Sequence, residues 1–141
     1  MAKNSYAVFG MGSFGSKLAV ALTRAGNTVL VCDSNPQRIE DIRDKVTDAV
    51  IGDVSNEDVI KELNISKFDA VILGMSSHFE DQILSLTLLK QEGVQKVYAK
   101  ANNVIQERIL YRLGADEIIQ PEQDVAERLS RRLTLDNISD M

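Results

Sequence analysis

Residues 6–15, YAVFGMGSFG, join a run of four apolar residues to a glycine-rich turn. Residues 16–25 follow with an amphipathic pattern, so this order predicts a strand, a turn and a helix. In a G-x-G-x-x-G turn, Gly10 lets the chain leave the strand sharply, Gly12 lets a pyrophosphate approach the backbone, and Gly15 lets the helix pack close to the strand. The free N–H groups at the start of the helix would hold the phosphates. The same glycines suit a purely structural turn, but the flanking strand and helix favour a nucleotide site.

Short apolar runs recur along the chain, at residues 6–9, 29–32, 49–51, 70–73, 97–99 and 118–119. Each run is continuous rather than alternating, as expected for strands that are buried on both faces. Segments with helical periodicity lie between and after the runs, at residues 16–25, 36–45, 56–63, 81–92, 104–113 and 121–135. Strands that alternate with helices pair in parallel through right-handed crossovers. The sequence therefore predicts an α/β, Rossmann-like fold with a doubly wound parallel sheet of six strands and a last helix after the sixth strand.

The predicted helices carry signals at their ends. Three glycines each follow a helix shortly before the next strand, at the position where a left-handed backbone favours glycine: Gly26, Gly93 and Gly114. Pro36 and Pro121 fit the first turn of a helix, where the missing N–H has no cost. Ser55 and Asp58 have the spacing of a capping box, which predicts that Ser55 caps the helix over residues 56–63.

The last predicted helix has Val125, Leu129 and Leu133 on one face. This apolar face suits packing on the chain's own sheet, and it equally suits an arm that pairs with another subunit. The pattern alone leaves both alternatives open, because either partner would bury the same stripe.

Composition and net charge favour some classes of protein and exclude others. The chain has 141 residues, of which 44% are hydrophobic and 26% charged, as in a single globular domain. No apolar run approaches the roughly 18 residues of a membrane span, and no secretory signal is recognisable, so we expect a cytoplasmic location. The net charge of −5 argues against a nucleic-acid partner, which requires a basic surface. The single cysteine, Cys32, lies in an apolar run and is expected to be a small buried core residue.

Carboxylates follow the second and third predicted strands, at the sheet edge where doubly wound folds bind ligands. Asp33 lies at about the distance from the glycine turn, roughly 20 residues, at which an acidic residue accepts the ribose hydroxyls of an adenosine. It would repel a 2′-phosphate, which disfavours NADP. Asp33 also suits a turn cap before Asn35, but the upstream glycines favour the ribose role. Asp53 suits a turn cap and the adenine side of the site equally well.

Further candidates follow the later strands. Gly74 permits a close ligand approach, and the serines at 76 and 77 suit phosphate binding or a helix cap. His78 has no recognisable acid or nucleophile beside it, so a surface or capping role is favoured over catalysis. Lys100 lies at the ligand edge and can supply positive charge to phosphates, although a lone lysine is normally solvated. Glu122 is typical of an acidic residue that complements a helix dipole.

Four motifs occur in one order along the chain: GMGSFG at 10–15, IGD at 51–53, YAKANN at 98–103 and LGADEIIQPE at 113–122. This order resembles the N-terminal lobe of the regulator-of-potassium-conductance domain, also called the RCK, KTN or TrkA-N domain. Within that family the pattern is most similar to the KtrA-type regulatory subunits of bacterial Ktr potassium transporters. The glycine motif is shared with many dehydrogenases, whereas the Lys-Ala-x-Asn and Leu-Gly-Ala-Asp pieces are much more specific.

The resemblance implies a nucleotide-binding RCK N-lobe over residues 1–120 and a crossover and dimerisation helix with a tail over residues 121–141. The C-terminal lobe of the family is absent, which predicts a fragment or a short member. The lobes would dimerise and assemble into a ring, an octamer, under a membrane-embedded potassium transporter subunit, at the inner face of the cell membrane. ATP and ADP, or NAD and NADH, would bind at the glycine turn and change the shape of the ring.

The resemblance also implies site residues. The cofactor site would comprise Gly10, Met11, Gly12, Ser13, Phe14, Gly15, Asp33, Asn35, Asp53, Gly74, Lys100 and Glu122. Glu122 matches a family acid near the nucleotide and the subunit interface, where it can help hold a divalent cation. The chain departs from the family at Ser13, where KtrA-like proteins often have an arginine that reaches the terminal phosphate of a neighbouring subunit's nucleotide. This departure puts selectivity for ATP over ADP in question and keeps NAD as an alternative.

These observations predict a non-enzymatic, nucleotide-sensing subunit that gates potassium uptake. No P-loop, H-E-x-x-H or G-x-S-x-G motif is found, so no catalytic residue is expected. The main alternative is the NAD-binding domain of an oxidoreductase, which needs a substrate domain that the region after the sixth strand is too short to supply. A methyltransferase also uses a glycine turn and an acidic residue after the second strand. A third alternative is an interaction module in which the glycines are only structural.

Overall fold

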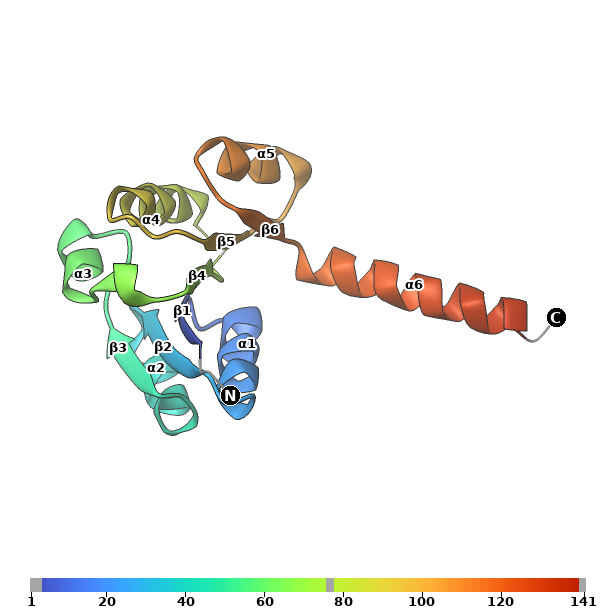
Figure 1. Ribbon diagram of the computed structural model, residues 1–141, viewed down its shortest axis with the longest axis horizontal. Coiled ribbons are helices and arrows are strands. Elements are labelled where there is room, and N and C mark those ends of the chain that lie inside the picture. Colours follow the sequence, from blue (N-terminus) through green and yellow to red (C-terminus); the bar gives the residue numbers. More distant parts are fainter. Residues whose placement is uncertain (1–3, 76–77, 140–141) are drawn as a thin grey trace.

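The computed structural model describes residues 4–75 and 78–139. Strands and helices alternate along the chain (Figure 1). The strands are β1 (Ser5–Phe9), β2 (Thr28–Asp33), β3 (Asp48–Ile51), β4 (Ala70–Leu73), β5 (Val97–Lys100) and β6 (Glu117–Ile119). The helices are α1 (Ser13–Arg24), α2 (Pro36–Ile42), α3 (Glu57–Glu62), α4 (Phe79–Gln91), α5 (Val104–Arg112) and α6 (Pro121–Ser139), with short 3-10 segments η1 (Arg43–Lys45) and η2 (Ile65–Lys67).

The strands form one sheet in the order β3-β2-β1-β4-β5-β6, and every pair is parallel. Val8 on β1 lies opposite Val31 on β2 and Ile72 on β4, which fixes the register at the centre of the sheet. The strand order reverses between β1 and β4, so the chain crosses over both faces of the sheet. The predicted Rossmann-like, doubly wound α/β fold with six parallel strands is confirmed.

A hydrophobic cluster lies on each side of the sheet. Phe9 from β1 faces α3, α4 and α5, which contribute buried residues such as Ile60, Leu86 and Leu110. The neighbouring Val8 faces the opposite side, where α1 and α2 cover the sheet. Because successive strand residues point to opposite faces, both faces of the central strands need apolar side chains. This requirement explains why the strands appear in the sequence as continuous apolar runs.

The helix ends follow the predicted signals with one exception. Gly26, Gly93 and Gly114 have φ of +98°, +83° and +108°, the left-handed region that favours glycine after a helix. The predicted capping box at Ser55 is wrong. Asn56 caps α3 instead, since its Oδ1 accepts a hydrogen bond from the Asp58 N–H at 2.8 Å. Ser55 donates both its hydroxyl and its backbone N–H to Asp53 Oδ1, and this turn delays the helix by one residue.

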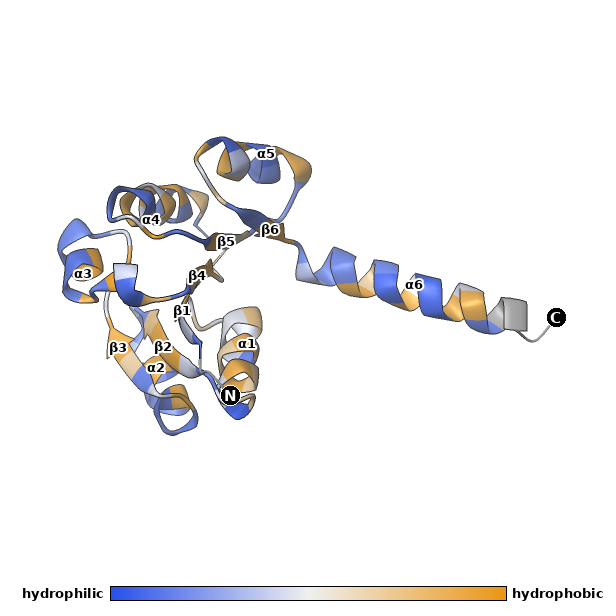
Figure 2. Cartoon of the chain, in the orientation of Figure 1, coloured by the Kyte–Doolittle hydropathy of each residue, from blue (hydrophilic) through white to orange (hydrophobic). Residues whose placement is uncertain are grey.

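Helix α6 extends away from the sheet and its covering helices (Figure 1). Residues 122–136 are all exposed, including the apolar Val125 at 58%, Leu129 at 46% and Leu133 at 55%. Apolar bands therefore recur along a helix that lies outside the core (Figure 2). Packing of α6 on its own sheet, one of the two alternatives, is contradicted. No helix within residues 4–75 and 78–139 has both the length and the apolar content of a membrane span.

Candidate nucleotide-binding site

A pocket of about 440 Å³ opens at the carboxyl ends of the strands. It lies over the point where the strand order reverses, which is where doubly wound folds bind their ligands. Nine of the twelve residues predicted for the cofactor site line it: Gly10, Gly12, Ser13, Phe14, Asp33, Asn35, Asp53, Gly74 and Lys100. The structure therefore brings together residues from four different strand ends and the glycine turn.

The glycine turn divides into two structural glycines and one that faces open space. Gly10 has φ of +91°, and a Cβ there would lie 2.8 Å from the backbone nitrogen of Met75. A Cβ on Gly15 would lie only 1.9 Å from the carbonyl oxygen of Gly10. A Cβ on Gly12, in contrast, would have no atom of the described residues within 4 Å. Packing within the described chain thus requires glycine at positions 10 and 15, whereas the space at Gly12 suits a ligand phosphate.

Gly12 is also the N-cap of α1, and no side chain of the described residues caps this end of the helix. The first N–H groups of a helix have no partner within the helix, and the helix dipole makes this end electropositive. Here those groups adjoin the glycine turn and the pocket. The arrangement matches the phosphate-binding end of a dinucleotide fold.

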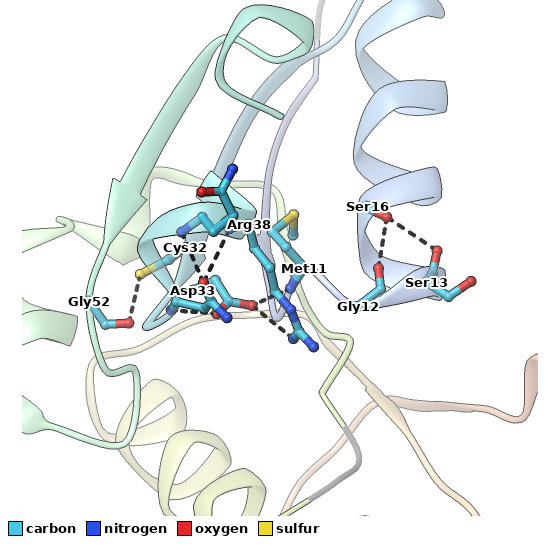
Figure 3. Close-up of polar contacts among 10 residues, drawn as sticks. Met11, Gly12, Ser13, Ser16, Cys32, Asp33, Arg38 and Gly52 are labelled. Atoms are coloured by element: carbon cyan, nitrogen blue, oxygen red, sulfur yellow. Dashed lines mark hydrogen bonds and ion pairs between the residues drawn. The ribbon is translucent and has the colours of Figure 1, made fainter. Parts of the chain in front are cut away.

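Asp33 connects the glycine turn to the loop after β2 (Figure 3). Its Oδ2 accepts a hydrogen bond from the Met11 N–H at 2.6 Å, and its Oδ1 accepts one from the Asn35 N–H at 2.8 Å. Arg38 Nη1 lies 3.6 Å from Oδ2, and the Asp33 side chain is only 9% exposed. A carboxylate has about four acceptor positions, so it retains capacity for a ribose hydroxyl. Asn35 lines the pocket too, but its side-chain oxygen is used to cap α2.

Asp53 lines the same side of the pocket. Hydrogen bonds from the Ser55 hydroxyl and backbone N–H lower the pKa of the Asp53 carboxyl below its usual value, so the group is ionised at neutral pH. Asp53 therefore caps the turn that contains Ser55, which is one of the two roles predicted for it. The carboxylate nevertheless faces the pocket, and the two roles coexist.

Lys100 and Phe14 form the opposite side. Lys100 Nζ lies 5.9 Å from the centroid of the Phe14 ring, a cation–π distance that keeps the ammonium group over the glycine turn. Gly74 also lines the pocket, but a Cβ there would lie 3.2 Å from the Phe9 oxygen and 3.3 Å from Gly15 Cα. The absence of a side chain at Gly74 therefore serves close packing of β1, β4 and α1.

Helix α4 contributes pocket residues that the sequence did not reveal as ligands. Asp81, in its first turn, lines the pocket, as does His78 at the N-cap position. The predicted surface position of His78 is confirmed, because the residue is exposed; it lies at the N-cap position of α4, but its side chain makes no capping hydrogen bond to the described residues there. The loop–helix boundary after the fourth strand is the signal that could have identified Asp81. The serines at 76 and 77 lie outside the described residues.

Three predicted residues do not line the pocket. Met11 is buried beneath the turn, where it offers its backbone N–H to Asp33, and Gly15 lies within α1. Glu122 is exposed on the first turn of α6, which leads away from the site. No three acidic, histidine or cysteine side chains among the described residues come together as a metal site would need. The cation role of Glu122 stays a prediction.

Cys32, at the end of β2, is among the residues that line the pocket and is completely buried. Burial, and then the charges of Asp33 and Asp53, raise the pKa of the Cys32 thiol to about 12. The Sγ atom lies 3.6 Å from the carbonyl oxygen of Gly52, as a weak donor (Figure 3). The thiol is therefore protonated at neutral pH, and the prediction that Cys32 is a buried core residue is confirmed.

We expect Cys32 in the folded chain to react with a disulfide reagent at pH 8 at least about a hundredfold more slowly than in the unfolded chain, because only the thiolate reacts. Thiol release followed by absorbance measures this ratio, with the chain in guanidinium as the control. Since the pKa is about 12 when folded and 9.0 ordinarily, the unfolded state ionises first as the pH rises. The free energy of unfolding should therefore fall between pH 9 and 12. Equal reaction rates would show that the thiol is accessible.

The comparisons with known proteins agree with this fold. The family model of the TrkA-N domain matches residues 6–121. Ktr system potassium uptake protein C of Bacillus subtilis (strain 168) is 34% identical over 138 residues, which cover 98% of this chain and 62% of the relative. Ktr system potassium uptake protein A of Vibrio alginolyticus is 33% identical, over 91% of this chain and 58% of the relative. The chain thus spans about three fifths of the length of these relatives.

Two solved proteins have the same fold. The NAD(P)-binding domain of an exopolyphosphatase-related protein from Archaeoglobus fulgidus superposes with a TM-score of 0.79 at 24% identity, covering 99% of this chain and all of that one. The GsuK channel, in structures bound to NAD and to ADP, gives TM-scores of 0.71 and 0.70 at 13% identity over 84% of this chain and 21% and 31% of those chains. Since the family model covers most of the sequence, the chain belongs to the TrkA-N domain family.

Proposed function

We propose that this chain is the nucleotide-sensing domain of a cytoplasmic regulatory subunit that gates a potassium uptake system. The observation that carries the proposal is the space at Gly12 that the described residues leave open, beside the first N–H groups of α1 and next to the Asp33 carboxylate, which accepts the Met11 N–H. Potassium uptake proteins among the relatives, and the NAD and ADP bound to GsuK, support a regulatory role for such a site.

The ligand is an adenine nucleotide, ATP or ADP, or NAD(H). Its phosphates would lie over Gly12 and the start of α1, where Lys100 adds positive charge. Asp33 would accept hydrogen bonds from the ribose, and Asp53 would line the adenine side. The low exposure of the Asp33 carboxylate makes a 2′-phosphate unfavourable there, because two negative charges would meet with little solvent between them. The bound nucleotide would regulate rather than react, so no residue is given a catalytic role.

Regulation would proceed by a shift between conformations of an assembly. A nucleotide changes the balance between two states only if it binds one of them better, since equal binding shifts nothing. In this proposal the chain forms a homodimer, and dimers assemble into a ring, an octamer, beneath a membrane-embedded potassium transporter subunit. Glu122, at the base of α6, would lie near the subunit interface and help hold a divalent cation there. The site is at the inner face of the cell membrane.

The exposed stripe on α6 supports the dimer. Val125, Leu129 and Leu133 recur every four residues and remain 46–58% exposed in the single chain. Apolar residues at this spacing form one helical face, and such a face is usually buried by a partner. A second copy of the chain supplies the same stripe, so two α6 helices can bury each other in a symmetric interface.

Leu129→Glu is expected to raise the dimer dissociation constant by about a hundredfold or more, because it buries an unpaired charge in the interface. Sedimentation of the unaltered chain and the variant measures the change. Arg128→Glu, on the same helix but off the apolar stripe, is the matched control and should leave the dimer intact. A monomeric unaltered chain, or a dimer insensitive to Leu129→Glu, would contradict the role of α6.

Calorimetric titration tests the proposed function, with ATP, ADP, NADH and S-adenosylmethionine added to separate portions of one sample. We expect binding of an adenine nucleotide that weakens by about tenfold or more in Asp33→Ala, since hydrogen bonds to a charged group are strong. Asp48→Ala, an exposed change at the amino end of β3, is the control. Binding of S-adenosylmethionine alone would favour a methyltransferase, and hydride transfer from NADH would favour an oxidoreductase. No binding would overturn the proposal.

A further inference from the structure

Helix α4 carries two buried polar side chains on the face that packs against the sheet. Gln82 and Ser85 are both 0% exposed, and among the described residues they are the only polar side chains in the buried core. They are three positions apart, so they lie on the same face of the helix. Buried polar groups are usually held by hydrogen bonds, and the partners of these two lie on different sides of the nucleotide pocket.

Ser85 reaches the side formed by the loop after β3. Its hydroxyl donates a hydrogen bond to the carbonyl oxygen of Val54 at 2.8 Å. Val54 lines the pocket, and it follows Asp53 in the sequence. The contact therefore fixes the backbone from which the Asp53 carboxylate faces the site.

Gln82 reaches the side formed by β5. Its Nε2 donates a hydrogen bond to the carbonyl oxygen of Lys100 at 2.7 Å. The pairing of β4 with β5 ends at Leu73 and Ala99, so Lys100 lies one residue beyond it. The Gln82 amide therefore donates to the Lys100 carbonyl oxygen at a position where β4 no longer pairs with β5. It holds the backbone from which the Lys100 side chain extends over Phe14.

We propose that Gln82 and Ser85 are positioning residues that set the width of the nucleotide pocket. Through Lys100, Gln82 would place the positive charge that meets the phosphates, and through Val54, Ser85 would place the adenosine side. Both sit on one rigid helix, so a nucleotide that moves one side of the pocket moves α4 and the other side with it. The inference rests on the proposed nucleotide binding.

A role in core packing alone makes a different prediction for Gln82. The Oε1 atom of Gln82 is buried and has no hydrogen-bond partner among residues 4–75 and 78–139, which is unfavourable for the folded state. Methionine has a similar length and would remove this unpaired acceptor, although it would also leave the Lys100 carbonyl without its donor. If Gln82 only fills space, Gln82→Met should therefore change stability modestly and leave the affinity of the folded chain for nucleotides unchanged.

The experiment compares adenosine with ADP in calorimetric titrations of four variants. For Gln82→Met we expect the ADP dissociation constant to rise about tenfold and that of adenosine to change by less than about twofold, because only ADP meets Lys100. For Ser85→Ala we expect both ligands to weaken by a similar factor, about threefold or more. Gln91→Met and Thr87→Val, exposed changes on the same helix, are the controls and should bind like the unaltered chain. Thermal unfolding without ligand records stability separately.

Equal affinities in Gln82→Met and the unaltered chain would overturn the inference, as would a loss of the same size for adenosine and ADP in that variant. If Gln82→Met does not fold, Ser85→Ala decides, and unchanged affinities there would overturn the inference. Failure of the unaltered chain to bind either ligand would overturn the proposed function and this inference with it. That result is distinct from variants that bind as the unaltered chain does.

Discussion

Gly12→Val is expected to abolish nucleotide binding while the chain keeps its fold. A Cβ at this position meets no atom within 4 Å in the part of the chain that the structure describes, and the backbone angles, φ −74° and ψ −165°, suit a β-branched residue. The valine side chain would instead fill the space through which a pyrophosphate approaches the backbone. The loss of those contacts should weaken ADP or NADH binding by about a hundredfold or more. Calorimetry gives the affinity, and circular dichroism with thermal unfolding gives the state of the fold.

Thr87→Val, the same side chain introduced at an exposed position of α4, is the control for Gly12→Val and should leave binding intact. If the Gly12 variant binds as tightly as the unaltered chain, the phosphates do not lie at the turn. If it unfolds, Gly12 has a packing role that the open space around it does not indicate.

Gly15→Ala is expected to destabilise the chain by about 3 kcal/mol or more. The new Cβ would lie 1.9 Å from the Gly10 carbonyl oxygen and 3.1 Å from its carbonyl carbon, and both are backbone atoms of a tight turn. Helix α1 would have to move away from β1, and overpacking of this kind costs about 1–3 kcal/mol or more. Denaturant unfolding followed by fluorescence or circular dichroism measures the free energy difference.

Gly12→Ala is the matched control for Gly15→Ala, because it makes the same change three residues earlier in the same turn. A glycine N-cap replaced by alanine should cost only about 1 kcal/mol or less. Equal unfolding free energies for the two variants would contradict the close packing of α1 against the end of β1. Comparison of the two variants therefore distinguishes Gly15, which close packing requires, from Gly12, which faces the proposed ligand.

The sheet could be predicted from the sequence because its strands are buried on both faces. Runs such as residues 29–32 and 70–73 have no polar member, and a strand at the centre of a parallel sheet allows none. The glycine turn was equally informative, since Gly10 and Gly15 meet backbone atoms that leave no room for a side chain. The distance of Asp33 from that turn predicts its place at the ligand edge, and Asp33 lines the pocket.

Other features could not be predicted from residue patterns. Helix α4 is recognised by its leucines, so the contribution of Asp81 to the pocket and the hydrogen bonds of Gln82 and Ser85 depend on contacts with distant loops. An amphipathic stripe looks the same whether the helix packs on its own sheet or on another subunit. The sequence therefore could not predict that α6 extends away from the core. The predicted start of α3 is wrong because the Ser55 hydroxyl hydrogen-bonds to Asp53 and therefore does not cap the helix.

In the proposed function, contacts with the nucleotide at Gly12 and Asp33 would supply affinity. Contacts at Lys100 and Asp53 would involve the two sides of the pocket, whose backbones α4 holds through Gln82 and Ser85. A regulatory nucleotide must bind one conformation of these two sides of the pocket better than the other, because only a difference in affinity between the states can shift their populations.

Titration of the isotope-labelled chain with ADP, followed through its backbone amide resonances, tests nucleotide binding at the glycine turn. We expect saturable shifts that are largest at Gly12, Ser13 and Asp33, with smaller shifts near Lys100. Shifts confined to Lys17, Arg24 and Lys45, which line a separate groove between α1 and α2, would contradict it, as would no shift at millimolar ADP and NADH.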